Sequence, residues 1–156
     1  MKNKYLAIII IVIIAIIALV GAFALGIFDN NQTSDSSDWE VKNLSGITFK
    51  IPPKYEQGTI QSGNIIDGVN TGNSYRSEDL SIIINSTNWT NDLNKSMDSD
   101  SAVMTVLDIN GHEVEIFSDN ESSKAFFKVK NSTITINWSG DNVNGDIKAL
   151  ITSFFN

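Results

Sequence analysis

The sequence predicts an α+β protein with an N-terminal transmembrane helix, followed by an antiparallel sheet of hairpins packed against a C-terminal helix. Three observations support this class. Residues 5–28 are apolar and uncharged, the middle of the chain alternates apolar with polar residues, and the last residues repeat apolar positions at helical spacing. The 156 residues suffice for one domain. We expect four segments, in order: a cytoplasmic stub 1–4, a transmembrane helix 5–28, a disordered acidic tether 29–38 and an extracytoplasmic α+β domain 39–156.

The N-terminal segment 5–28 has 24 positions without a charge. A helix of this length spans about 36 Å, enough for a hydrocarbon core of roughly 30 Å. Lys2 and Lys4 precede it and acidic residues follow it, which predicts a cell-membrane protein with its N-terminus in the cytoplasm and its C-terminal domain outside. The alternative is a signal peptide cleaved after Ala24, but the apolar run exceeds a usual signal core, which favours an uncleaved anchor.

The segment 29–38 contains no apolar residue, so it has nothing to bury and predicts a disordered tether. The whole chain has a formal charge of −7, yet all 18 acidic residues and only nine of the 11 basic ones lie beyond residue 28, which gives 9 − 18 = −9 there. A domain this acidic is repelled by phosphate backbones. We therefore expect no nucleic-acid partner.

The first half of the domain predicts short strands. Residues 47–51 alternate apolar and polar side chains, and the following Pro52-Pro53 ends that strand because proline cannot donate to a ladder. Evenly spaced glycines in 57–76 favour a meander of weak strands over one long loop. The apolar run 80–84 predicts a central strand, and 90–97 predicts a short helix.

The second half predicts two hairpins and a helix. Strands 103–109 and 113–117 flank Asn110-Gly111, a sequence typical of type I′ turns. Strands 125–130 and 133–138 flank a second turn, Asn131-Ser132. The closing helix places four apolar residues at core-facing spacing, with Asn144 as its expected cap and Asp146 in its first turn. These four residues are Ile147, Leu150, Ile151 and Phe154.

Three of these features resemble the PsbP/MOG1-like family of small α+β domains. They are the opening run Phe49-Lys50-Ile51-Pro52-Pro53-Lys54-Tyr55, the Asn110-Gly111 hairpin and the closing helix Asp146–Phe155. Together they extend over residues 46–155. The family includes photosystem assembly and Ran-binding proteins as well as lipoproteins, so the resemblance implies a fold and not an activity. No functional residue of the family has a matching motif in this sequence.

The chain contains eight Asn-x-Ser/Thr sequons, which predict N-glycosylation of an extracytoplasmic domain. The alternative is that they follow from a composition rich in asparagine and serine. The eight acceptors are Asn31, Asn43, Asn85, Asn88, Asn94, Asn120, Asn131 and Asn137.

The residue types exclude most catalytic chemistry. The chain has no cysteine and one histidine, His112, which excludes disulfides, zinc–thiolate sites, thiol nucleophiles and most histidine-based sites. Asp98-Ser99-Asp100 lacks the later glycine and glutamate of a calcium loop. Alternation along a strand explains why Glu113 and Glu115 share a face. We therefore predict no catalytic residue, metal site or cofactor, and we expect the large aromatics to serve mainly as core. These are Trp39, Tyr55, Tyr75, Trp89 and Trp138.

These observations predict a single-pass membrane-anchored, extracytoplasmic binding or interaction domain rather than an enzyme. Its expected partners are the lipid bilayer, through residues 5–28, and a protein or glycan at the cell surface. Two alternatives are an envelope hydrolase that uses acidic residues and a glycosylated structural surface protein.

Overall fold

The computed structural model describes residues 33–156. In this part of the chain 45% of residues lie in strands and 17% in helices, and both α-helices are only nine residues long. The predicted α+β class is therefore wrong, and the described chain is a mostly β structure built on one large antiparallel sheet. Most of its strands are predicted one by one, but the share of residues in strands depends on how far each segment pairs with its neighbours, which no single segment shows.

The predicted transmembrane helix 5–28, the stub 1–4 and the first residues of the tether lie outside the described residues. Between residues 33 and 156, no helix has the length and apolar character needed to cross a membrane. The compact unit begins at Ser34. The backbone N–H of Ser34 donates to the carbonyl of Gly145 at 3.2 Å, and Lys50 Nζ donates to the carbonyl of Ser36 at 2.7 Å. The last residues assigned to the tether thus contact the domain.

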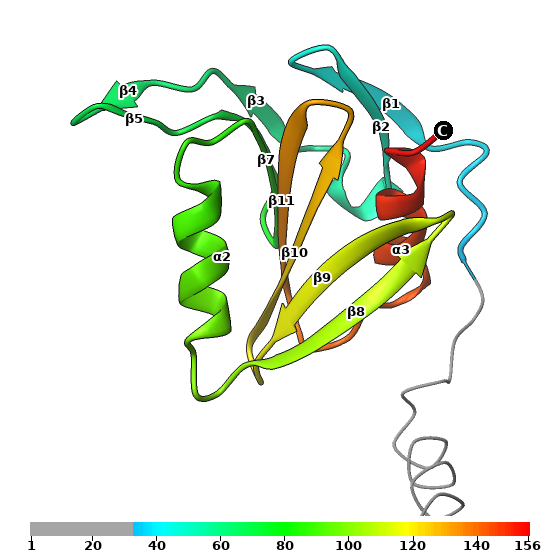
Figure 1. Ribbon diagram of the computed structural model, residues 1–156. Helices are drawn as coiled ribbons and strands as arrows, with labels where there is room; N and C mark the ends of the chain where they lie inside the picture. The colour runs from blue at the N-terminus through cyan, green and yellow to red at the C-terminus, as the bar shows by residue number, and fades with distance from the viewer. Residues whose placement is uncertain (1–32) are drawn as a thin grey trace, which may run out of the picture. The chain divides into compact units, whose positions relative to one another are not determined.

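One seven-stranded antiparallel sheet organises the unit, with two small hairpins beside it (Figure 1). The large sheet has the order β3-β6-β7-β11-β10-β9-β8. Its strands are β3 (Thr59–Gln61), β6 (Asn73–Arg76), β7 (Leu80–Ile84), β8 (Val103–Ile109), β9 (His112–Ser118), β10 (Ser122–Val129) and β11 (Ser132–Ser139). The hairpins are β1 (Glu40–Leu44) with β2 (Ile47–Ile51), and β4 (Ile65–Ile66) with β5 (Val69–Asn70). A single 3-10 turn, Pro53–Tyr55, follows β2.

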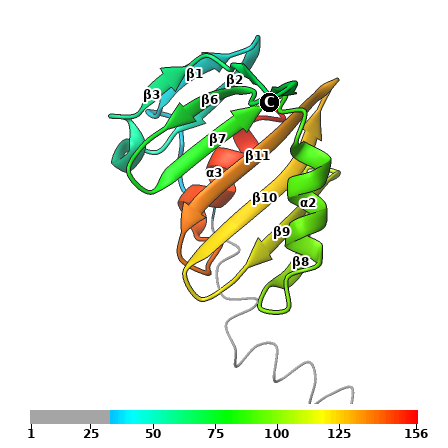
Figure 2. The same cartoon turned by 90° about the vertical axis from the view of Figure 1, so that its left-hand side faces the viewer.

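The helices α2 (Trp89–Met97) and α3 (Gly145–Ser153) lie on opposite faces of the large sheet (Figures 1 and 2). The main core forms on the α3 side, where the β1–β2 hairpin also packs. Phe49 of β2 stacks on Phe154 with ring centroids 4.7 Å apart. On the α2 side, Trp89 meets Phe126 edge to face at 6.1 Å, and its Nε1 donates to the carbonyl of Ile134 at 3.2 Å. The sheet is therefore buried on both faces near its centre.

Most of the expected local elements are present. The short strands expected in 57–76 are present, but they do not form the predicted meander, because β3 pairs with β6 while β4 and β5 form a separate hairpin between them. The strand Leu80–Ile84 is confirmed, and Asn110 and Gly111 both have positive φ, at 56° and 79°, as a type I′ turn requires. The second turn differs from its prediction. Val129 pairs with Ser132, so the two-residue loop is Lys130-Asn131. Strand β1 was not predicted, because its residues are mostly exposed and show no apolar alternation.

Candidate functional site

The most exposed apolar part of the large sheet is its terminal strand, β8. This strand pairs with β9 without interruption from Val103↔Ser118 to Ile109↔His112. No other strand within residues 33–156 pairs with its outer side. Val103, Met104 and Val106 are 69%, 47% and 51% exposed, respectively. We call residues 103–109 the β8 edge.

The two edges of the sheet differ in how they are protected. The opposite edge, β3, has only three residues. The β8 edge has seven residues and contains no lysine, no proline and no bulge in its register. Short strands, lysines, prolines and bulges are the usual means by which proteins keep an edge from pairing with another chain. The β8 edge lacks these four, and its one charged residue, Asp108, lies at the hairpin end, so among residues 33–156 nothing keeps the start of the edge from pairing with a further strand.

The register shows which backbone groups face outward. In a two-residue hairpin the residues flanking the loop, here Ile109 and His112, form a hydrogen-bonded pair, and such pairs alternate along an antiparallel ladder. The N–H and C=O groups of Met104, Val106 and Asp108 therefore point away from β9. Their side chains lie on the α2 face of the sheet, and those of Val103, Thr105 and Leu107 lie on the α3 face.

A hollow of about 240 Å³ adjoins the start of the β8 edge. Val103 and Thr105 form its strand side, and Ser118 lies opposite Val103 on the same face. Asp119 and Asp141 bring two carboxylates to its lining, which Ser101 and Asn120 complete. The backbone N–H groups of Glu121 and Ser122 donate to Asp119 Oδ1 at 2.9 and 2.8 Å, and these bonds hold the pKa of Asp119 below its ordinary value. This carboxylate is therefore ionised at neutral pH.

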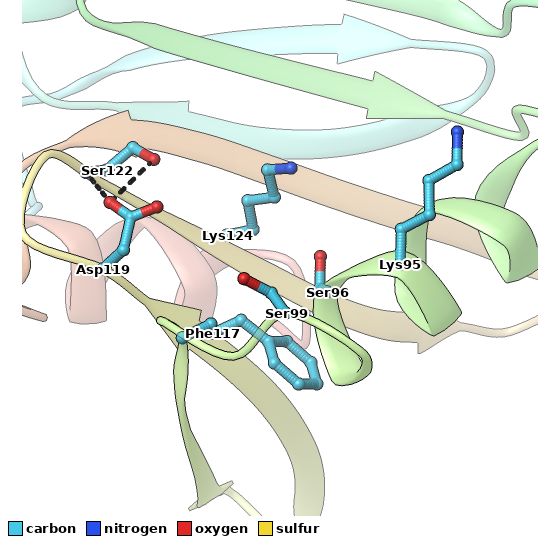
Figure 3. A pocket seen from close by; sticks show the side chains of 8 residues that line it. Lys95, Ser96, Ser99, Phe117, Asp119, Ser122 and Lys124 are labelled. Atoms are coloured by element: carbon cyan, nitrogen blue, oxygen red, sulfur yellow. Dashed lines mark hydrogen bonds between the residues drawn. The ribbon is translucent and has the colours of Figure 1, made fainter.

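A second hollow, of about 170 Å³, lies beneath the C-terminal end of α2 (Figure 3). Two of its polar residues, Ser96 and Asp119, have structural partners. Ser96 Oγ donates to the carbonyl of Asp92 at 3.0 Å, and Asp119 holds the β9–β10 turn through Ser122, as the dashed lines in Figure 3 show. Phe117 forms its apolar side. These interactions stabilise the turn and the helix end.

The acidic pair and the histidine considered from the sequence do not converge on a site. Glu113 is exposed and Glu115 half-buried on the α2 face of β9, with Val114 and Ile116 buried on the other face as alternation predicts. The His112 ring stacks flat on Phe155, with centroids 4.2 Å apart. Across residues 33–156, no group of three or more histidine, aspartate or glutamate side chains is arranged to hold a metal ion.

The described sequon asparagines fall into two groups. The side-chain nitrogens of Asn43, Asn85 and Asn137 already donate hydrogen bonds, to Thr48, Ser132 and Ser81 at 3.3, 3.3 and 2.9 Å. The remaining described acceptors have no side-chain hydrogen bond to residues 33–156. Of these, Asn94, Asn120 and Asn131 are exposed and Asn88 is half-buried. Asn137 is half-buried, and Asn31 lies outside the described residues.

Four of the five large aromatics that the sequence assigned to the core are buried, namely Trp39, Tyr55, Tyr75 and Trp138. Trp89 is half-buried against β10. The β8 edge was not predicted, because a strand's position in a sheet depends on pairing with distant segments. The one signal in its own region is the absence of lysine and proline from 98–121. No protein-family model matches the chain, and no curated protein matches it.

Proposed function

We propose that this protein is a membrane-anchored, extracytoplasmic interaction domain that binds a partner protein through the β8 edge. The observation that carries the proposal is a seven-residue terminal strand with exposed apolar side chains and outward-facing backbone groups. Such an edge suits β-strand addition, in which backbone hydrogen bonds supply affinity and adjacent pockets supply specificity. The uncharged segment 5–28 supports attachment to the bilayer, and the flanking lysines support an outside location.

Site-specific photo-crosslinking in intact cells tests the interaction. A photoreactive residue at Thr105, on the β8 edge, is expected to give a discrete adduct with another protein. The matched control is Thr48, an equally polar and exposed residue on β2. Equal adducts from both positions, or none from Thr105, would contradict the proposed binding surface.

Protease accessibility tests the location. Full-length protein is expected to stay with membranes at alkaline pH and to lose residues 39–156 to protease added outside intact cells. A mature chain that begins at Leu25, or a domain protected from external protease, would contradict the proposed anchoring.

The exposed sequons favour a second feature, a glycosylated surface. Asn94, Asn120 and Asn131 have solvent-exposed side chains, as an acceptor requires. Enzymatic deglycosylation of the native protein is expected to lower its mass, and an unchanged mass would exclude modification.

A further inference from the structure

We infer that the partner strand of the β8 edge is an extended, basic segment of another protein, with a lysine or arginine side chain entering the hollow beside Val103 and Thr105. This inference rests on the proposed function and specifies the chemistry of its partner. Three independent features of the described residues determine this chemistry. They are the backbone pattern of the edge, the difference between its two faces, and the charge around it.

The backbone pattern requires an extended partner. The outward N–H and C=O groups of Met104, Val106 and Asp108 recur at every second residue, which only another strand matches along its length. A helix satisfies its own backbone groups and leaves those of the edge without partners. The bound segment must therefore be extended over about five to seven residues, the length of the edge.

The two faces of the β8 edge favour different side chains in the partner strand. On the α2 face, Met104 and Val106 offer an exposed apolar surface, and the exposed carboxylate of Asp108 follows at the hairpin end. On the α3 face, the hollow is lined by Asp119 and Asp141 next to Thr105. Because successive side chains of a strand point to opposite faces, one set of partner side chains meets Met104 and Val106, with Asp108 at its end, and the other set meets the carboxylates of the hollow. A segment that alternates apolar with basic residues fits both faces.

The charge around the edge selects a basic partner over a second copy of this chain. Residues 98–121 contain seven acidic residues and no lysine or arginine. All seven side chains are exposed or half-buried. Pairing two β8 edges would bring two such segments together, and their like charges would repel. A basic segment gains attraction from the same groups.

The test uses full-length protein in nanodiscs of zwitterionic lipid and three capped octapeptides. The first peptide alternates lysine with valine, and the matched peptides have glutamate or glutamine in place of lysine. Fluorescence anisotropy of labelled peptide measures affinity, with empty discs as the blank. Hydrogen exchange measures protection of the β8 amides. We expect the lysine peptide to bind at least about tenfold more tightly than the glutamate peptide, and to slow exchange at Met104, Val106 and Asp108.

Three variants locate the contact. Val106→Pro removes one outward N–H without touching the ladder to β9, and is expected to weaken binding about tenfold, whereas Val106→Ala keeps the N–H and is expected to stay within about threefold. Asp141→Asn is expected to weaken the lysine peptide about threefold and to leave the glutamine peptide unchanged. Thermal unfolding confirms that each variant is folded.

Each other result contradicts the inference. No binding of the lysine peptide, equal binding of all three peptides, or equal effects of Val106→Pro and Val106→Ala would overturn it. A dimer of the chain that Val106→Pro dissociates would identify a second copy as the occupant. If Thr105 still gives its crosslink in cells while the lysine peptide fails, the proposed function stands and only the basic partner is refuted. If the crosslink also fails, both are refuted.

Discussion

The buried side chain of Tyr75 holds the loop 55–58, whose conformation cannot be predicted from the residues of the loop alone. It lies on β6 with no exposed surface, donates from Oη to the carbonyl of Tyr55 and accepts from the N–H of Gly58 at 3.1 Å. A Cβ at Gly58 would lie 2.5 Å from the Tyr75 ring, so this position requires glycine. The sequence identified Tyr75 as core, but these hydrogen bonds follow only from the folded chain.

Replacement of this tyrosine tests the hydrogen bonds. Tyr75→Phe leaves the carbonyl of Tyr55 and the N–H of Gly58 without the phenol, and is expected to lower the free energy of unfolding by about 1–3 kcal/mol. Urea denaturation of the full chain measures this difference. A loss below about 0.5 kcal/mol would show that water replaces the phenol.

The same residue predicts a dependence on alkaline pH. Burial raises the pKa of Tyr75 above its value in the unfolded chain. The neutral phenol is therefore favoured in the folded state, and its stabilisation is complete below about pH 10 and lost as pH rises through the higher folded pKa. We expect the stability difference between wild type and Tyr75→Phe to shrink in this range. A difference constant to pH 12 would contradict this reasoning.

Glycines show how the connecting elements constrain the chain. Gly68 and Gly72 both have positive φ, at 80° and 73°. They differ in their surroundings, because a Cβ at Gly68 would meet nothing within 4 Å, whereas one at Gly72 would lie 2.6 Å from the carbonyl oxygen of Ile84 and 2.8 Å from the nitrogen of Ser86. Gly72 thus allows the start of β6 to pass closely beside the end of β7.

Alanine substitutions at Gly68 and Gly72 separate the cost of backbone strain from the cost of a steric clash. Gly68→Ala is expected to lower the free energy of unfolding by about 1–2 kcal/mol through its φ alone. Gly72→Ala adds the clash with backbone atoms, and its total effect should be larger by about 1–3 kcal/mol. Thermal unfolding measures both variants. Equal effects would show that the backbone moves aside at no cost.

The cap of α3 is a local element that the sequence predicts correctly. Asn144 Oδ1 accepts from the N–H of Ile147 at 3.0 Å, as the spacing indicates. Asn144→Ala is expected to lower the free energy of unfolding by about 1 kcal/mol. Asn142→Ala is the matched control, because this exposed side chain caps no helix and only its main-chain oxygen is used, by Trp138 Nε1. Similar losses from both variants would argue against a capping role.

At the scale of the whole unit, aromatic side chains join elements that are distant in sequence. Phe154, at the C-terminal end of α3, stacks on Phe49 of β2 and meets Phe127 of β10 edge to face at 5.4 Å. The helix, the hairpin and the sheet therefore share one core. These contacts cannot be deduced from the sequence, which shows that the three phenylalanines are apolar but not that they contact one another.

Truncation of Phe154 tests how much this aromatic cluster contributes to the free energy of unfolding. Phe154→Ala is expected to lower the free energy of unfolding by about 3–5 kcal/mol, because it removes a buried ring and leaves a cavity between three elements. The neighbouring Phe155→Ala removes a half-buried ring that stacks on His112, so its effect should be smaller. Denaturant titration ranks the two, and a reversed order would contradict this view of the core.

Four features follow from the amino-acid sequence without the fold: the separation into an apolar N-terminal segment and an acidic remainder, the Asn110-Gly111 turn, the α3 cap and the absence of thiol chemistry. These are local properties, set by residue type and by neighbours a few positions away. The tertiary structure alone decided that β sheet dominates the described chain, that the second turn is Lys130-Asn131 and that β8 lies at an edge. Alternation reports which face of a strand is buried, but not which neighbours complete its ladder. Strand order depends on contacts between distant residues, and it leaves Met104 and Val106 exposed on β8 although their residue types favour burial.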